Sequence, residues 1–570
     1  MNISEARLLI ENLLDRIEQD PVSGKFKLGT ISNREKLGLE MLIGADLGDR
    51  SDTPSTAQPE SPDRLVAQQA LQQPAQPEVA PQMSPVPAET VAVAVPVVSL
   101  NLKALDKVEA DDPNVTVCLD FGTAMSKAFA IEGYSKPVEL ALGQRAGGTG
   151  YPVESSLFIS EDALLYFGPQ AVQLGNDAAA LGRSRFDSPK SRLSMGQQVD
   201  INRAPIKKEI NPIESTPVTE GELITLYLGY LTDLACTELE AHGHSRYCAR
   251  RFARPCWSDD RNKWAEPLLR RMLAQAQILA DTFHGQWQEG IPLATAKQAV
   301  AQLKELSKLP DYLVAKEGIP EPVAAAASLM LTDDDQRDLF MVVDVGAGTT
   351  DFGLFMLQHN PDMDICKVRI LPNTIKVLEQ AGNRVDDMLK FFILEQEGID
   401  KSSAEGEHNL GYLQSTIRLY KEALFRDGHV EVPLANRSRA KVDLQAFLGS
   451  SRVLAFSQQL HKEMMEVLNA AGDGYLDLMR DGCLRVVLTG GGADLPMIQN
   501  LASGVVEVRG RLIERKPMPH VPAWINESYP QFAPQYPQLA VAIGGANPEL
   551  PELAQSFADF KGLRRPTYTA

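Results

Sequence analysis

The chain has few aromatic residues, few cysteines and no long apolar run. Aromatic residues make up 6% of its 570 residues, and the six cysteines (118, 236, 248, 256, 366 and 483) form no C-x-x-C pair. No apolar run reaches the ~18 residues that a membrane span needs. The longest candidate, Val91–Val98, contains Pro96. The cysteines also lack the spacing of zinc ligands, so we expect reduced thiols, and we expect no membrane partner.

Basic residues are also fewer than acidic ones. The chain has 56 Lys and Arg against 75 Asp and Glu, which gives a net charge of −19. Nucleic-acid binding depends on clustered Lys and Arg, so we expect no nucleic-acid partner. A small anion such as a nucleotide is not excluded, because local geometry rather than net charge holds it. Residues 1–5 contain no basic segment, so we predict no signal peptide and a cytoplasmic protein.

The distribution of aromatic residues gives the first boundary, because none occurs between Phe26 and Phe121. Residues 51–96 contain nine prolines and seven glutamines, a composition that cannot bury enough apolar area to offset chain entropy. We predict a disordered, flexible Pro/Gln-rich linker over residues 51–113. Before it, apolar residues at helical spacing from Ile3 to Ile17 and from Leu39 to Ile43 predict a helical interaction module over residues 1–50. It either docks another protein or another copy of this chain, or folds back on the main body.

Two similar strand–turn–strand units occur in the remainder, which alternates strand-like and helix-like segments and so predicts an α/β body. The strand Val115–Leu119 ends at Asp120, and the strand Phe340–Val343 ends at Asp344, which is 344 − 120 = 224 residues later. In both units a Gly/Thr turn follows the aspartate and a second strand follows the turn. The repetition predicts two related lobes that face a shared cleft.

The turns of both units carry groups suited to a metal-bound polyphosphate. Glycines permit tight turns whose amide N–H groups face an anion, and hydroxyls add further donors. Aspartates suit Mg²⁺, which keeps its hydration shell and is bound through water. The residues concerned are Asp120, Gly122, Thr123, Ser126, Asp344, Gly346, Gly348, Thr349, Thr350 and Asp351.

A third glycine-rich element follows the strand Leu484–Leu488. Gly490, Gly491 and Gly492 stand between that strand and the predicted helix Met497–Leu501, where they would allow a ligand to approach the backbone. The two common phosphate motifs are missing. The chain contains no G-x-x-x-x-G-K-[ST], and Gly346-Ala-Gly lacks the third glycine of a dinucleotide fingerprint.

The three elements, in this order, resemble the phosphate-one, phosphate-two and adenosine motifs of the actin-like ATPase superfamily. Within it the chain most resembles the nucleotide-binding domain of the heat-shock protein 70 chaperones, over nearly all of residues 114–549. The further matching segments are Glu321-Pro322-Val-Ala-Ala-Ala-Ala, Pro189-Lys190-Ser-Arg192-Leu193, the helix with Arg418 and Lys421, and Ala540–Gly544.

The resemblance implies an α/β, two-lobed actin-like ATPase (ribonuclease H-like) fold with a nucleotide cleft between its lobes. The expected boundaries are lobe I over 114–338, lobe II over 339–524, a return helix to lobe I over 525–550 and a C-terminal tail over 551–570. After Gly544 there are 570 − 544 = 26 residues. We therefore expect this chain to lack the family's substrate-binding domain and lid.

The resemblance also assigns roles, with ATP/ADP and Mg as cofactors. Lys190, Glu321, Asp344 and Asp351 would be catalytic, and Asp120 and Asp344 would hold Mg²⁺ through water. The nucleotide would be bound by Asp120, Gly122, Thr123, Ala124, Gly346, Ala347, Gly348, Thr349, Arg418, Lys421, Gly490, Gly491 and Gly492.

Three departures from the family pattern bear on nucleotide affinity and coupling. Ala124 replaces a second threonine and removes a hydroxyl donor, and Asp494 replaces an arginine beside the adenine. The family's proline-to-arginine relay fits Pro255, with either Arg261 or Lys263 as its partner.

The expected function is slow ATP hydrolysis by a chaperone-like conformational switch that acts through a protein partner or co-chaperone. Three alternatives remain open: an actin-like, nucleotide-dependent filament or scaffold, a small-molecule kinase, and a nucleotide-binding interaction module without turnover. The sequence contains no separate motif for an acceptor-hydroxyl site, which a kinase would need.

Overall fold

The structure is a computed structural model that describes residues 17–19, 26–28, 98–134, 136–179, 181–331, 337–360, 365–477, 479–519 and 521–554. The chain divides into two compact units, residues 1–91 and 92–570. In the first unit, β1 (Ile17–Gln19) and β2 (Phe26–Leu28) pair in antiparallel fashion. The helical prediction is therefore wrong at Ile17. The other apolar positions on which the predicted helices rest lie outside the described residues.

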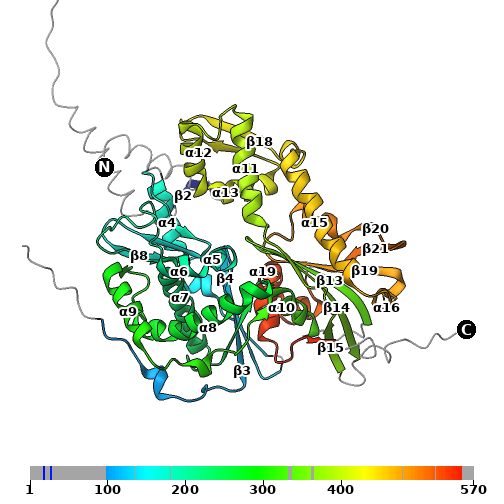
Figure 1. Cartoon of the computed structure of the whole chain (residues 1–570), viewed down its shortest axis with the longest axis horizontal. Helices are drawn as coiled ribbons and strands as arrows, with labels where there is room; N and C mark the ends of the chain where they lie inside the picture. The colour runs from blue at the N-terminus through cyan, green and yellow to red at the C-terminus, as the bar shows by residue number, and fades with distance from the viewer. Residues whose placement is uncertain are drawn as a thin grey trace, which may run out of the picture. The chain divides into compact units, whose positions relative to one another are not determined.

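The second unit is a mixed α/β structure built on several sheets (Figure 1). Its first large sheet has the order β12-β10-β3-β4-β5, and β6 pairs with β4. The strands are β3 (Val115–Asp120), β4 (Met125–Glu132), β5 (Lys136–Val138), β6 (Val153–Glu154), β10 (Arg250–Arg254) and β12 (Ile319–Pro320). A smaller sheet has the order β11-β8-β7-β9, from β7 (Ser156–Ile159), β8 (Leu164–Phe167), β9 (Phe186–Asp187) and β11 (Ile291–Pro292).

The second large sheet has the order β20-β21-β19-β13-β14-β15-β22, and β16 pairs with β14. Its strands are β13 (Arg337–Val345), β14 (Thr350–Asn360), β15 (Ile365–Ile370), β16 (Lys376–Leu378), β19 (Cys483–Thr489), β20 (Gly504–Val508), β21 (Arg511–Pro517) and β22 (Glu552–Leu553). In both large sheets an antiparallel hairpin is flanked by a parallel strand: β10 beside β3, and β19 beside β13. The two predicted strand–turn–strand units are thus confirmed as β3–β4 and β13–β14.

Helices from the first half of the unit pack around the first sheets. The longest are α7 (Glu220–Ala241) and α8 (Asp259–Thr282). The others are α3 (Leu142–Arg145), α4 (Gly168–Ala179), α5 (Pro189–Met195), α6 (Gln198–Arg203) and α9 (Leu293–Glu305). Helix α7 begins with a capping box, in which the Thr219 hydroxyl accepts from the Glu222 N–H and the Glu222 carboxylate accepts from the Thr219 N–H. Most residues of α7 are buried, which places this helix at the centre of one hydrophobic core.

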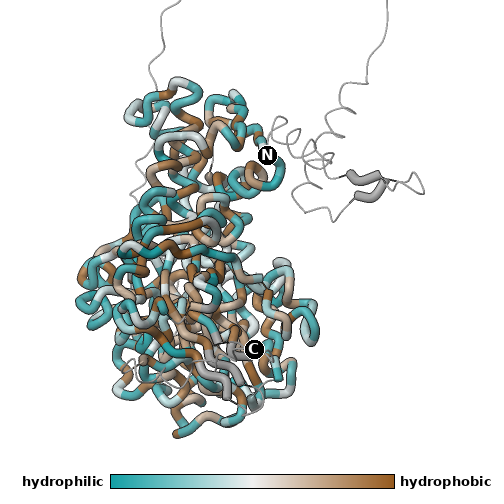
Figure 2. The backbone as a smooth tube through the Cα atoms, turned by 90° about the vertical axis from the view of Figure 1, so that its right-hand side faces the viewer, coloured by the Kyte–Doolittle hydropathy of each residue, from teal (hydrophilic) through white to brown (hydrophobic). Residues whose placement is uncertain are grey.

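Most helices from the second half share a second hydrophobic core with the second large sheet. They are α11 (Gly382–Gln396), α12 (Ala404–Gln414), α13 (Ile417–Asp427), α14 (Leu444–Leu448), α15 (Ser451–Ala470), α16 (Asp473–Leu476) and α17 (Pro496–Gln499), with the hairpin β17 (His429–Pro433) and β18 (Arg439–Asp443). Helix α18 (Ala523–Ser528) instead packs in a cluster with Cys118 and Phe129 of the first sheet. In Figure 2 the hydrophobic segments lie mainly along the strands and helices of this unit, and its peripheral loops are mostly hydrophilic.

Two short helices lie where the large sheets come together. Helix α10 (Glu321–Ala327) shares a buried cluster with Ala253 of the first sheet and with Phe340 of the second. Helix α19 (Tyr536–Ala546) packs on β3 and β4, and it crosses α10 so closely that a Cβ on Gly544 would lie 1.7 Å from the Ala324 carbonyl oxygen. The predicted return helix over residues 525–550 thus contains a helix packed on the first sheet.

The predicted flexible linker over residues 51–113 is wrong for residues 98–113, which pack on the body. The Asn101 N–H donates to the Thr282 hydroxyl at 2.9 Å, and the Tyr312 hydroxyl donates to the Ala104 carbonyl at 2.8 Å. Ala104 is fully buried in a short 3-10 helix, η1 (Lys103–Asp106). Residues 51–97 lie outside the described residues.

The start of the predicted tail over residues 551–570 also belongs to the body. Strand β22 pairs in parallel with β15, and the Ala554 N–H donates to the Ile370 carbonyl at 3.0 Å. Residues 555–570 lie outside the described residues. Among the helices described, none combines the length and the apolar character required to cross a bilayer.

Candidate functional site

The predicted site residues converge on one cleft with a volume of about 580 Å³. Both large sheets contribute to it, together with α5, α10, α13 and the glycine turn after β19. Fifteen of the seventeen predicted residues line the cleft: Asp120, Gly122, Thr123, Ala124, Lys190, Glu321, Asp344, Gly346, Ala347, Thr349, Arg418, Lys421, Gly490, Gly491 and Gly492.

The other two predicted residues lie directly behind this lining. A Cβ added to Gly348 would lie 3.0 Å from Oγ1 of Thr123, so the turns of the two hairpins approach each other there. Asp351 is fully buried and stands opposite Asp344 in the β13–β14 register. All seventeen predicted residues therefore belong to one region, although their roles remain predictions.

Close packing of the backbone requires glycine at two positions in these turns, Gly122 and Gly490. A Cβ on Gly122 would lie 1.8 Å from the Met125 carbonyl oxygen. Gly490 has φ +83°, and a Cβ there would lie 2.4 Å from the Val345 carbonyl oxygen. A side chain at either position would force the backbone out of the turn. These turns leave space beside the carboxylates for a ligand that approaches the main chain.

Lys190 forms the cationic centre of the cleft floor. It lies in the first turn of α5, which Pro189 begins, and it is 3% exposed. Its Nζ forms an ion pair with Glu321 Oε1 and lies 4.0 Å from Asp120 Oδ1. Burial opposes the charge on Lys190, but the attraction of Glu321 and Asp120 outweighs it and raises the pKa of this lysine. Lys190 therefore stays protonated at neutral pH.

The carboxylates around Lys190 are buried and close to one another, and both effects disfavour their ionised forms. Burial raises the pKa of Glu321 to about 7, with further repulsion from Asp351 and Asp120 against the attraction of Lys190. Burial, followed by repulsion from Glu321, Asp351 and Asp120, raises the pKa of Asp344 well above its ordinary value. If all four carboxylates, Asp120, Glu321, Asp344 and Asp351, were ionised, the cluster would carry more negative charge than Lys127 and Lys190 offset.

This surplus fits a cation. Asp120 and Asp344 would hold Mg²⁺, and its electrostatic effect would favour the ionised form of both side chains. In the part of the chain that the structure describes, no group of three or more His, Cys, Asp or Glu residues is placed to hold a metal directly. The geometry is consistent with a metal held through water and a ligand's phosphates rather than in a protein cage.

The part of the cleft lined by α13 is suited to a larger, partly apolar group. Helix α13 lines it with Arg418, Lys421 and Phe425. Lys421 is held by an ion pair to Asp386 at 2.7 Å and by a bond to the Gly382 carbonyl at 3.3 Å. The cleft thus combines the cations and the aromatic side chain of α13 with the carboxylate cluster around Lys190. Ala124 and Asp494, which depart from the family pattern, both line the cleft.

Lys127 is the most important lining residue that the sequence reasoning missed. It stands opposite Asp120 in the β3–β4 register, and its Nζ donates to Asp120 Oδ2 at 2.9 Å. Reading the two strands as an antiparallel hairpin would have paired these residues. The other lining residues that were not predicted are Met125, Gly382, Glu422, Phe425, Arg426, Leu444, Leu495, Pro496, Gln538 and Val541.

The structure distinguishes the two candidates for the relay partner of Pro255. Arg261 Nη1 donates to the carbonyls of Leu193 at 3.0 Å and Gly196 at 2.9 Å, at the C-terminal end of α5, the helix that contains Lys190. Lys263 is exposed and forms an ion pair with Asp260. Of the two, Arg261 is therefore the one bonded to the Lys190 helix.

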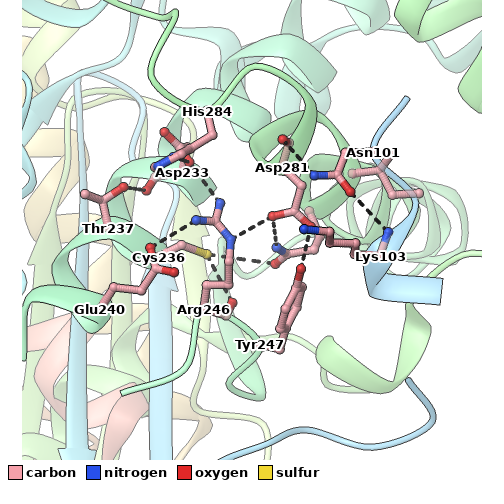
Figure 3. Close-up of polar contacts among 12 residues, drawn as sticks. Asn101, Lys103, Asp233, Cys236, Thr237, Glu240, Arg246, Tyr247, Asp281 and His284 are labelled. Carbon is pink, nitrogen blue, oxygen red and sulfur yellow. Dashed lines mark hydrogen bonds and ion pairs between the residues drawn. The ribbon is translucent and has the colours of Figure 1, made fainter. Parts of the chain in front are cut away.

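A second polar cluster lies away from the cleft, at the C-terminal ends of α7 and α8. Arg246 forms ion pairs with Asp233, Glu240 and Asp281 (Figure 3). The carbonyl of Asp281 also accepts from the side chain of Asn101. The Asn101 contact joins this cluster to residues 98–113 and contributes to holding that segment on the body.

A scan against protein-family models and a search of curated proteins found no match for this chain. The functional argument therefore depends on the cleft.

The carboxylate cluster makes stability depend on pH. The folded-state pKa of Glu321, about 7, lies above its ordinary value of 4.5, so its stabilising contribution is complete below pH 4.5 and is lost as the pH rises toward 7. We expect the free energy of unfolding to fall less between pH 5 and 7 in Glu321→Gln than in the unsubstituted chain. Denaturant unfolding at several pH values measures this. The exposed Glu407→Gln is the control, and an unchanged slope in Glu321→Gln would contradict the charge assignment.

Lys127 also gives a direct prediction. Because it neutralises Asp120 at the edge of the cleft, Lys127→Met should weaken binding of a polyphosphate by about tenfold, and Lys127→Arg should retain most of it. Fluorescence titration with a labelled nucleotide measures the affinity. Equal affinities for Lys127→Met and the unsubstituted chain would show that this ammonium group does not contribute.

Proposed function

We propose that this chain is an ATP-binding, slowly ATP-hydrolysing conformational switch of the actin-like ATPase type, closest to the nucleotide-binding domain of heat-shock protein 70 chaperones. The observation that carries the proposal is the convergence of predicted residues from six separate segments on one cleft, with Lys190 paired to Glu321 at its floor. In this proposal the two large sheets are the cores of two lobes, and α10 and α19 lie where the lobes meet.

The chemistry follows from the charges in the cleft. Phosphoryl transfer needs positioning and neutralisation of the transferred group more than covalent catalysis. Mg²⁺, when bound, would supply neutralising charge at the phosphates. The ammonium group of Lys190 would hold the terminal phosphate and the attacking water, and Asp351 or Glu321 would accept a proton from that water. The turns at Gly122 and Gly346 would present main-chain N–H groups to the phosphates.

Coupling to a partner would follow from the position of the cleft. A ligand that contacts turns of both sheets draws the lobes together, and its hydrolysis weakens that link. In this proposal a protein partner or co-chaperone reads the change, through residues 1–50 or through a lobe surface.

One observation favours a second candidate, a nucleotide-binding module without turnover. Lys127 already forms an ion pair with Asp120, one of the two residues expected to hold Mg²⁺. A side chain that occupies a metal ligand favours binding over metal-assisted hydrolysis.

Single-turnover hydrolysis of Mg-ATP by the full chain distinguishes the two candidates. Conversion of bound ATP to ADP supports the switch, and stoichiometric binding without conversion supports the module. Light scattering with ATP and with ADP tests the filament alternative in the same samples. A chain that stays monomeric in the presence of either nucleotide excludes the filament alternative.

A further inference from the structure

One hydrogen bond joins the first half of the second unit to the start of a helix that lines the cleft. Arg185 directly precedes β9, and its Nη2 donates to the Ser415 main-chain carbonyl at 3.2 Å. Ser415 ends α12, and α13 begins two residues later. The two residues are 230 positions apart in sequence, and neither lines the cleft itself. No motif in the sequence assigned a role to either of them.

The guanidinium group of Arg185 is anchored within the first half before it reaches the second. Its Nε donates to Asp187 Oδ1 and its Nη2 to Asp187 Oδ2, both at 3.0 Å. Its Nη1 donates to the Val172 carbonyl at 3.1 Å and to the Asn176 side chain, both on α4. The side chain lies so close to α4 that a Cβ added to Gly175 would be 2.1 Å from Arg185 Cγ. Because a planar guanidinium held at these points has one orientation, little freedom is lost in the bond to the second half.

The Ser415 carbonyl is a suitable acceptor for a cation. It belongs to the C-cap of α12, where carbonyls lack an intrahelical donor and carry partial negative charge. A charged donor forms a stronger hydrogen bond than a neutral one. Because the acceptor is a main-chain atom, the bond depends on the side chain of Arg185 and not on that of Ser415.

The bond fixes the position of α13 relative to the opposite side of the cleft. Ser415 lies three residues before Arg418 and six before Lys421, which line the cleft from α13. Arg185 lies five residues before Lys190, which lines the cleft from the first half. The glycine turns belong to the β3–β4 and β13–β14 hairpins, to which Arg185 makes no hydrogen bond in the described part of the chain.

We propose that Arg185 is a positioning residue that holds α13 against the nucleoside part of a bound nucleotide from the opposite side of the cleft, and thereby slows nucleotide release. This inference rests on the proposed nucleotide-binding function and adds a residue to it. Without Arg185, α13 can move away from the cleft, and the nucleoside loses Arg418 and Lys421. The phosphates keep the glycine turns and Lys190.

The first test compares binding of Mg-ATP and of inorganic Mg-triphosphate to the full chain and to Arg185→Met. The Kd for Mg-ATP should rise about five- to twentyfold, mainly through faster dissociation, while that for Mg-triphosphate should change less than about twofold. Titration calorimetry measures both affinities, and stopped-flow release of a labelled nucleotide measures dissociation. General damage to the cleft would weaken both ligands equally, and that result would overturn the inference.

Two matched variants control for the loss of local bonds. Asn176→Ala removes a bond that Arg185 makes within the first half, and Ser415→Ala keeps the acceptor carbonyl. Both should retain the affinities of the unsubstituted chain. An Arg185→Met variant that retains affinity and release rate for the nucleotide would overturn the inference and leave the proposed function in place. An unsubstituted chain that binds neither ligand would overturn both.

A second test needs no ligand and shows whether a folded Arg185→Met variant has lost its hold on the second half. Hydrogen exchange of the full chain, resolved by peptide, should be severalfold faster over α12 and α13 in this variant, because the bond across the cleft is lost. In Asn176→Ala only peptides around α4 should exchange faster. Unchanged exchange over α12 and α13 in Arg185→Met would show that the bond does not hold α13, and the inference would fail.

Discussion

Replacing Lys190 with methionine is expected to lower the single-turnover rate of ATP hydrolysis by at least about a hundredfold, while nucleotide affinity falls less than about threefold. The reason is the position of Lys190, which is buried at the cleft floor between Glu321 and Asp120. The phosphates would keep their main-chain donors from the glycine turns, and the nucleoside end would keep Arg418 and Lys421. The loss should therefore fall on the chemical step rather than on binding.

A folding control is needed, because this variant leaves a buried carboxylate without its partner. The double variant Lys190→Met with Glu321→Gln removes both charges and should unfold closer to the unsubstituted chain, yet remain inactive. Lys263→Met, at an exposed position, controls for the loss of a lysine. Full turnover in a folded Lys190→Met variant would contradict the assignment of Lys190 to catalysis.

The largest effect on stability is expected at Gly544, where α19 crosses α10. A Cβ there would lie 1.7 Å from the Ala324 carbonyl oxygen and 2.6 Å from the Ser328 nitrogen, which are main-chain atoms that cannot move aside alone. Gly544→Val should lower the free energy of unfolding by at least about 3 kcal/mol, as for severe overpacking.

Gly411 on α12 supplies the matched control, because a Cβ at that helical glycine would have no neighbour within 4 Å. Gly411→Val should change stability by less than about 1 kcal/mol. Denaturant unfolding of both variants measures the difference. Equal stabilities would show that the two helices do not cross this closely.

Much of the cleft could be predicted because its residues follow strong local patterns. Asp120 and Asp344 each end an apolar strand before a glycine turn, and both features are visible over about ten residues of sequence. The two hairpins were therefore predicted at the observed places, although the observed strands are longer: β13 spans Arg337–Val345, against the predicted Phe340–Val343. Assignment of the turns to one cleft came from the resemblance, not from the patterns themselves.

Long-range contacts could not be predicted in the same way. The Lys127–Asp120 pair depends on strand register, and the Cys256–Asp351 bond joins residues 95 positions apart in sequence. The segment 98–113 contains no aromatic residue and follows the Pro/Gln-rich stretch 51–96, so the sequence groups it with the linker. It is ordered by hydrogen bonds to distant partners such as Thr282, and no local pattern indicates those partners.

Equilibrium binding of Mg-ATP to the full chain, measured by titration calorimetry, tests most directly whether the cleft binds a nucleotide. Gly491 lines the cleft, and a Cβ there would have no neighbour within 4 Å, so Gly491→Phe should obstruct the cleft without disturbing the fold. We predict one site per chain with a Kd of about 10 μM or tighter, corresponding to about 7 kcal/mol. Binding should be lost in Gly491→Phe and retained in Gly411→Phe. A folded, unsubstituted chain that gives no saturable binding, or equal binding by Gly491→Phe, would contradict the assignment of this cleft as a nucleotide site.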